Sequence, residues 1–61
     1  MKILKIRTSH KDPNMDIVLA EVNRYSGKYA TFISNKEFGG YQAGEYFHDY
    51  REAMISFWDR Y

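Results

Sequence analysis

The C-terminal segment, residues 49–61, constrains the fold most because it has the pattern of a short amphipathic helix. Asp49 can cap the start of this helix, and Glu52, three residues on, completes the pattern of a capping box. At about 100° per residue, the apolar and aromatic side chains share one arc of about 140°, which contains Tyr50, Ala53, Met54, Phe57, Trp58 and Tyr61. An isolated helix of this length is marginal in water, so this stripe must pack on the rest of the chain.

The segments before the helix have the composition and spacing of β-strands, at residues 1–8, 15–25, 28–34 and 41–47. Ser26-Gly27 predicts a hairpin in which Gly27 supplies a positive φ. Gly44 suggests a bulge or the close approach of another backbone. The order of the segments predicts an α+β fold over one domain, residues 1–61. We expect an antiparallel meander sheet of three or four strands with the C-terminal helix packed on one face.

A chain of 61 residues is near the lower size limit for a domain without cross-links, and this chain has no cysteine. It is rich in aromatic residues, with six tyrosines, four phenylalanines and one tryptophan. Because each large ring can bury about 150–250 Å², we expect most of these rings to form the core. The structural core is predicted to contain Phe32, Phe47, Met54, Phe57 and Trp58. An exposed aromatic recognition surface is the alternative explanation.

The sequence lacks the residue patterns of the common catalytic and metal sites. Without cysteine, no disulfide, thiol nucleophile or cysteine-ligated zinc can form. Asp12, Asn14 and Asp16 match the first half of a calcium loop, but its glycine and its final glutamate are missing. His10 and His48 are the only histidines, and nothing in the sequence brings them together. We therefore expect no metal, no cofactor and no enzymatic activity.

The N-terminus does not have the pattern of a signal peptide, and no apolar run is long enough to span a membrane. We therefore expect a cytoplasmic protein that does not enter the membrane.

Several basic residues fall on the predicted strands. We expect the helix to leave a charged and hydroxyl-bearing face of the sheet open to water or to a partner. Side chains available there for a nucleic acid or a protein partner are Lys5, Arg7, Arg24, Lys28 and Tyr29. Such residues could contact phosphates and stack bases, although solvated lysines explain the charges equally well. The net charge of +1 does not by itself indicate a nucleic-acid partner.

Residues 28–60 carry a recurrent pattern made of Tyr29-Ala30-Thr31-Phe32, Gly40-Tyr41, Gly44-Glu45-Tyr46-Phe47, Glu52-Ala53, Phe57 and Arg60. It resembles small uncharacterised proteins of bacteriophages and mobile elements of Gram-positive bacteria, in which a "YVTW" strand leads to "GHYF" and an "EALxxF" helix. This chain has Glu45 where those proteins often have histidine, and Phe32 where they often have tryptophan. The resemblance implies a small accessory protein that binds a host protein in the host cytoplasm.

The leading hypothesis is a non-enzymatic interaction module that binds a host or phage protein. An exposed sheet edge could pair with a partner strand, or with a second copy to give a homodimer. The alternative hypothesis is nucleic-acid binding through the basic sheet face.

Overall fold

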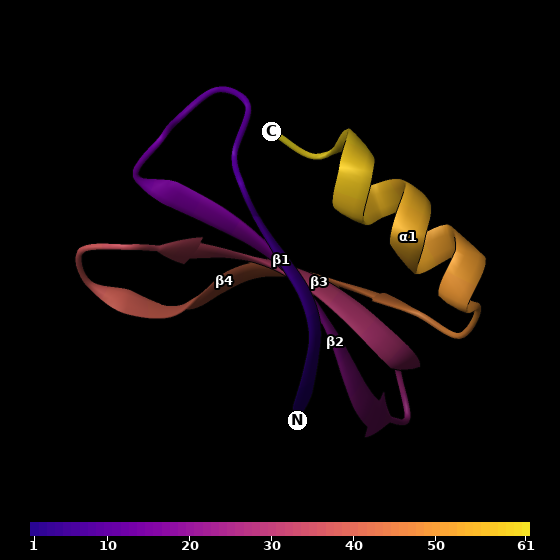
Figure 1. The fold of residues 1–61 in the computed structure, drawn as a ribbon. Helices are drawn as coiled ribbons and strands as arrows, with labels where there is room; N and C mark the ends of the chain where they lie inside the picture. The colour runs from indigo at the N-terminus through magenta and orange to yellow at the C-terminus, as the bar shows by residue number, and fades with distance from the viewer.

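The computed structural model describes all 61 residues. Its elements are β1 (Lys2–Thr8), β2 (Met15–Arg24), β3 (Gly27–Asn35), β4 (Gly39–Phe47) and α1 (Tyr50–Asp59). The four strands form one antiparallel sheet in the order β1-β2-β3-β4, and α1 packs on one face of it (Figure 1). The predicted α+β meander with a C-terminal helix is confirmed. The helix is not long and apolar enough to cross a membrane.

The helix begins where the sequence predicts it. The Asp49 carboxylate accepts a hydrogen bond of 3.1 Å from the backbone N–H of Arg51, which satisfies one of the free donors at the helix start. The acceptor bond is made with the second residue of the helix and not with the third, and the Glu52 side chain does not bind the Asp49 amide, so Asp49 caps the helix without forming the predicted capping box. The helix ends at Asp59 because Arg60 is extended, with φ of −71° and ψ of 137°.

The main core lies between the sheet and α1. Its fully buried residues come from the middle of β2 and from the inner face of the helix, and they are Ile17, Leu19, Ala53 and Phe57. Half-buried side chains pack around them, namely Leu4, Tyr29, Ile33, Phe47 and Met54. Phe47, Met54 and Phe57 therefore lie in or against this core.

The prediction that Trp58 belongs to the core is wrong. Trp58 is 53% exposed, and Tyr50 and Tyr61, at the ends of the stripe, are also exposed. A single short helix contacts the sheet along a narrow line, so only the centre of the predicted arc, at Ala53 and Phe57, is buried. Trp58 instead packs edge-on against the Phe57 ring, with centroids 5.0 Å apart.

A bulge in β1 changes which side chains face the helix. The register with β2 shifts between Ile3 and Lys5, which leaves Leu4 as an extra residue. After the bulge, Lys5 and Arg7 pair with residues of β2 that point toward α1, so both lie on the helix side of the sheet. Ile6 lies on the opposite side together with Ile3. In the regular alternation expected from the sequence, Ile6 shares the face of Leu4, and Ile3 shares the other face with Lys5 and Arg7.

The β2–β3 hairpin differs from the predicted one in its use of glycine. Arg24 pairs with Gly27, so Tyr25 and Ser26 form the turn. The positive φ in this region, 51°, belongs to Asn23 and not to Gly27. Gly27 is needed for space, because a Cβ atom there would lie 2.7 Å from the backbone nitrogen of Phe47 on β4. The close approach of a second backbone, which was one of the two alternatives for Gly44, therefore occurs at Gly27.

Gly44 lies beside a bulge in β4, as predicted, and makes room for an aromatic ring. The pairing of β3 with β4 shifts between Thr31 and Ile33, next to Ala43, which has a φ of 52°. A Cβ atom on Gly44 would lie 2.8 Å from the Phe32 ring, so the ring rests directly on the glycine.

Replacing Gly44 with alanine should therefore displace the Phe32 ring and destabilise the fold by about 1–3 kcal/mol. Urea denaturation followed by circular dichroism measures this change. The exposed neighbour Gln42 provides the control, since Gln42→Ala should stay within about 0.5 kcal/mol of the original protein. Equal stability of both variants would show that the ring does not need the glycine.

Candidate functional site

The face of the sheet opposite α1 is not covered by any other element (Figure 1). The expectation that this face is charged and hydroxyl-bearing is wrong, because aliphatic and aromatic side chains from all four strands cover it. We call this surface the open face. It consists of Ile3, Ile6, Val18, Ala20, Val22, Ala30, Phe32, Tyr41 and Tyr46.

An aromatic group from β3 and β4 forms one half of the open face. The Phe32 ring lies between those of Tyr41 and Tyr46, with centroid distances of 5.5 and 6.0 Å. The tilted and edge-on geometries of these pairs are the favourable ones for aromatic rings. Phe32 is thus a buried residue, as predicted, but it packs on the open face and not beneath the helix.

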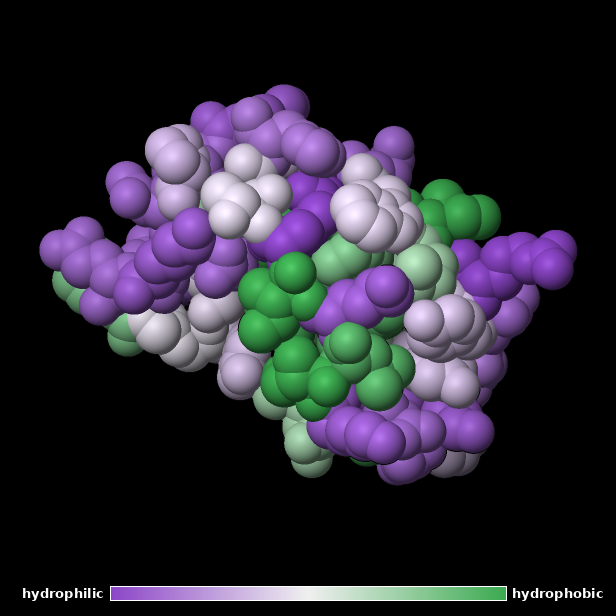
Figure 2. All heavy atoms as spheres, in the orientation of Figure 1, coloured by the Kyte–Doolittle hydropathy of each residue, from purple (hydrophilic) through white to green (hydrophobic).

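The open face has a closed inner layer and an accessible outer layer. Val18, Ala20 and Ala30 are fully buried by their larger neighbours on the same face. Ile6 and Tyr41, by contrast, are 58% and 50% exposed. Figure 2 shows hydrophobic residues gathered over β1, with hydrophilic residues around them. The outer side chains are therefore available to an apolar partner surface, and the buried side chains between them support this surface.

One end of the open face has a polar border. The Lys36 ammonium group lies 3.5 Å from the Asp16 carboxylate and donates a hydrogen bond of 3.1 Å to the Thr8 hydroxyl. Asp16 is paired with Thr8 on β1 and with Ser34 on β3, so this border crosses three strands. An apolar centre with a polar rim is the usual arrangement of a protein-binding surface.

The basic residues singled out from the sequence do not form one face. Lys5 and Arg7 lie on the helix side of β1, whereas Arg24 and Lys28 flank the β2–β3 turn. Arg7 pairs with Ile17, and Arg24 lies seven residues further along β2, which corresponds to roughly 20 Å. The expected basic sheet face is therefore absent, and these charges are distributed over separate parts of the molecule.

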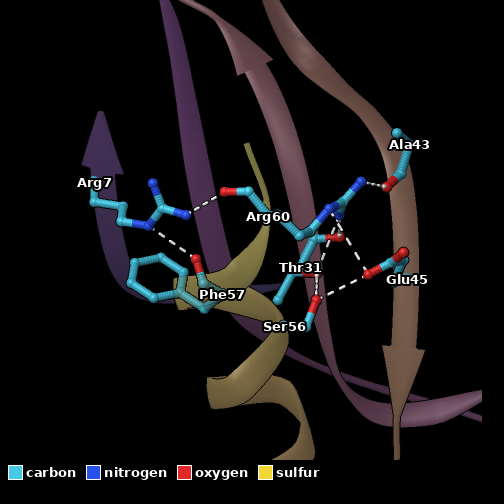
Figure 3. Close-up of polar contacts among 7 residues, drawn as sticks. All are labelled: Arg7, Thr31, Ala43, Glu45, Ser56, Phe57 and Arg60. Atoms are coloured by element: carbon cyan, nitrogen blue, oxygen red, sulfur yellow. Dashed lines mark hydrogen bonds and ion pairs between the residues drawn. The ribbon is translucent and has the colours of Figure 1, made fainter. Parts of the chain in front are cut away.

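Arg7 is part of the fold. Its Nε donates a 2.8 Å hydrogen bond to the carbonyl oxygen of Phe57, and its Nη2 donates to that of Arg60 (Figure 3). Its guanidinium carbon also lies 5.5 Å from the Phe57 ring centroid and 5.8 Å from the Trp58 ring centroid. Burial lowers the pKa of Arg7, since desolvation penalises the charged form. The cation interacts favourably with the carbonyl oxygens at the helix C-terminus, which carry partial negative charge.

Arg60 joins the end of the helix to β3 and β4. Its Nη1 donates to the carbonyl and hydroxyl oxygens of Thr31, and its Nη2 donates to the carbonyl of Ala43 at 2.7 Å (Figure 3). Ser56 donates to the Glu45 carboxylate at 2.8 Å, so the Thr31 hydroxyl donates in turn to the Ser56 oxygen, 2.9 Å away. This chain of bonds fixes the helix on the sheet and leaves none of its hydroxyl groups unpaired.

Tyr29, the remaining predicted contact residue, lies on the helix side of the sheet. It is half-buried, and its ring packs edge-on against that of Tyr50 at 5.2 Å. Lys28 lies with its ammonium group 5.7 Å from the centroid of the same ring. Tyr29 therefore helps to hold the start of the helix and is not free to stack on a base.

The two histidines lie at opposite ends of α1. His48 precedes the helix, while the backbone N–H of His10 donates to the carbonyl oxygen of Tyr61 beyond its end. A helix of ten residues separates them by about 15 Å. Of the acids near Pro13, Asp12 accepts a hydrogen bond from the Asn14 amide in a turn, and Asp16 pairs with Lys36.

No protein-family model, no curated protein and no solved structure matches this chain. The geometry of the open face is therefore the main basis for a functional proposal. The alternation of β1 does not reveal the bulge at Leu4, so the sequence does not indicate that Ile3 and Ile6 share the open face. Two signals of an apolar face were present: the continuous apolar run from Ile17 to Ala20, which indicates a strand with both faces covered, and the alternation that places Ala30 and Phe32 on one face of β3.

Proposed function

We propose that this protein is a non-enzymatic accessory protein that acts by binding a partner protein through its open face. The observation that carries the proposal is the exposure of large apolar side chains at both margins of this face, Ile6 on β1 and Tyr41 on β4, which no other element covers. Large apolar side chains exposed on one face of a sheet are typical of interaction sites. Aliphatic side chains bind by excluding water and carry no group that could transfer a proton or attack a substrate.

The size of the open face agrees with this role. Four strands about 4.8 Å apart, paired over five to eight positions at about 3.3 Å each, give a face of roughly 400 Å². A standard protein interface buries about 800 Å² on each partner. The open face would thus supply about half of such an interface, and its polar border or an adjoining strand edge would supply the rest.

A comparison of two isoleucine variants tests the proposal. Ile6 on the open face and Ile55 on the outer surface of α1 are 58% and 63% exposed, so aspartate at either position should be tolerated equally by the fold. The immobilised protein and both variants are incubated with a bacterial lysate, and the retained proteins are quantified by mass spectrometry. We expect a protein that is retained by the original chain and by Ile55→Asp but at least tenfold less by Ile6→Asp.

Thermal denaturation of the two variants provides the control, because equal midpoints exclude unfolding as the cause of lost binding. The proposal is overturned if the retained protein binds Ile6→Asp as well as it binds Ile55→Asp. It is also overturned if no protein is retained.

The bacteriophage or mobile-element context, and with it the host cytoplasm, rests on the sequence resemblance of residues 28–60. Nucleic-acid binding is the weaker proposal, because Arg7 and Tyr29 are engaged within the fold and the other basic residues are dispersed. A titration with single-stranded and double-stranded oligonucleotides separates the two proposals. Binding that weakens strongly with salt would favour the nucleic acid.

A further inference from the structure

The two edges of the sheet differ in their ability to accept another strand. On β4, Gly39, Gly40 and Ala43 have positive φ values of 74°, 76° and 52°, and the strand is bulged. Such irregularity prevents an added strand from pairing along it. On β1, the pairing with β2 runs without a break from Lys5 to Thr8. β1 has a bulge of its own at Leu4, but none of its residues has a positive φ and its four residues after the bulge pair without a break, so its outer edge is the more regular of the two.

The outer edge of β1 is also unpaired. β1 has β2 as its only neighbour in the sheet, and in Figure 1 no other strand lies beyond it. An edge strand presents backbone N–H and C=O groups that can form hydrogen bonds with an added strand. Addition of a strand here would extend the open face, because Ile3 and Ile6 lie at its margin.

The two sides of β1 have different chemistry. On the helix side lie Lys2, Lys5 and Arg7, and on the open side lie Ile3 and Ile6. Lys2 and Lys5 form no ion pair, whereas Arg7 is bound to the carbonyl oxygens of Phe57 and Arg60. The side chains of an added strand also alternate between these two sides. Acidic residues would thus lie beside the cations and apolar residues beside the isoleucines.

A second copy of the chain is a poor occupant of this edge. Antiparallel pairing of β1 with β1 of another copy would bring the Lys2, Lys5 and Arg7 side of one strand against the same side of the other. Like charges on opposed cross-strand positions are destabilising, while opposite charges are stabilising. The charge of the edge therefore favours an acidic partner over a homodimer formed through β1.

We propose that the outer edge of β1 binds an extended segment of a partner protein in which acidic and apolar residues alternate. The segment adds as a fifth strand, its backbone pairs with β1, and its acidic side chains lie beside Lys2 and Lys5. This inference rests on the proposed function and names the kind of partner segment that the same surface would recognise.

A synthetic peptide of seven alternating valines and glutamates, blocked at both ends, tests the proposal. It is titrated into the isotope-labelled protein at low salt, and the backbone amide signals are followed by NMR. We expect saturable shifts that are confined to β1 and the facing residues of β2. The Lys2→Glu, Lys5→Glu double variant should bind the peptide at least tenfold more weakly, whereas Lys28→Glu, the same charge reversal on β3, should stay within twofold.

Two control peptides separate the contributions of charge and of strand pairing. A peptide with lysine in place of glutamate should not bind the original protein but should bind the double variant. A glutamate peptide with N-methyl groups on the amides that face β1 should lose binding, because these amides can no longer donate hydrogen bonds to the strand. Equal binding of the lysine peptide, or unchanged binding by the double variant, would overturn the proposal. Shifts confined to β4, or concentration-dependent shifts without any peptide, would also overturn it.

Failure of this experiment leaves the proposed function intact. Lys2 and Lys5 lie on the helix side of β1, whereas the capture experiment depends on Ile6 on the opposite side. If a captured protein no longer binds Ile6→Asp but still binds the Lys2→Glu, Lys5→Glu double variant, strand addition is refuted and binding through the open face is supported. Equal capture by Ile6→Asp would instead refute the proposed function.

Discussion

Replacing Phe57 with alanine is expected to lower the unfolding midpoint by about 15 °C or more, which leaves little folded protein at room temperature. Phe57 is 1% exposed and is the largest fully buried side chain of the molecule. Removal of a buried phenylalanine ring costs about 3–5 kcal/mol. A domain of this size has only about 3–5 kcal/mol of stability from its core. Thermal denaturation followed by circular dichroism measures the change.

Trp58→Ala is the matched comparison for Phe57→Ala. The two residues are adjacent on α1, but Trp58 is 53% exposed, so its removal should cost only about 1–2 kcal/mol. The variant should therefore unfold cooperatively at a moderately lower temperature. If Trp58→Ala were as destabilising as Phe57→Ala, the helix would pack on the sheet in a different orientation from the one described.

Replacing Arg7 with alanine is expected to destabilise the fold by about 2–4 kcal/mol. The substitution removes hydrogen bonds from a charged donor to the carbonyl oxygens of Phe57 and Arg60, and each such bond contributes about 1.5–3 kcal/mol. The contact with the Phe57 and Trp58 rings is lost as well. Urea denaturation of the variant measures the effect.

Two further variants show which property of Arg7 matters. Lys5 lies on the same side of the same strand but makes no hydrogen bond through its side chain, so Lys5→Ala should change stability by less than about 0.5 kcal/mol. Arg7→Lys keeps the charge but lacks the planar pair of donors, so it should recover only part of the loss. Full recovery with lysine would indicate that charge alone stabilises the helix end.

The order of the elements could be predicted because the signals for it are local. The Asp49 carboxylate caps the helix by accepting from the amide of Arg51, two residues on, and the turns between strands contain polar residues or glycine. The faces of β3 are also the ones that the alternation of Ala30 and Phe32 with Tyr29 and Thr31 indicates. These features depend on residues that are close in the sequence.

The chemistry of the two sheet faces could not be predicted, because it depends on contacts between distant residues. The bulge at Leu4 places Lys5 and Arg7 on the helix side, and no residue of β1 indicates that a bulge forms there. Arg7 then finds its acceptors at Phe57 and Arg60, about fifty positions away in the sequence. A shift of one residue exchanges the two faces of a strand, so this bulge places Ile6 beside Ile3 on the open face and removes Lys5 and Arg7 from it.

The central claim is that the sheet face opposite α1 binds the partner. The most direct test is methyl NMR of the isoleucine and valine side chains, recorded before and after addition of the protein retained in the capture experiment. The methyl signals of Ile3, Ile6 and Val22 should shift, while that of Ile55 on the outer surface of α1 should not. A shift of the Ile55 signal with unchanged signals from Ile3 and Ile6 would contradict the claim.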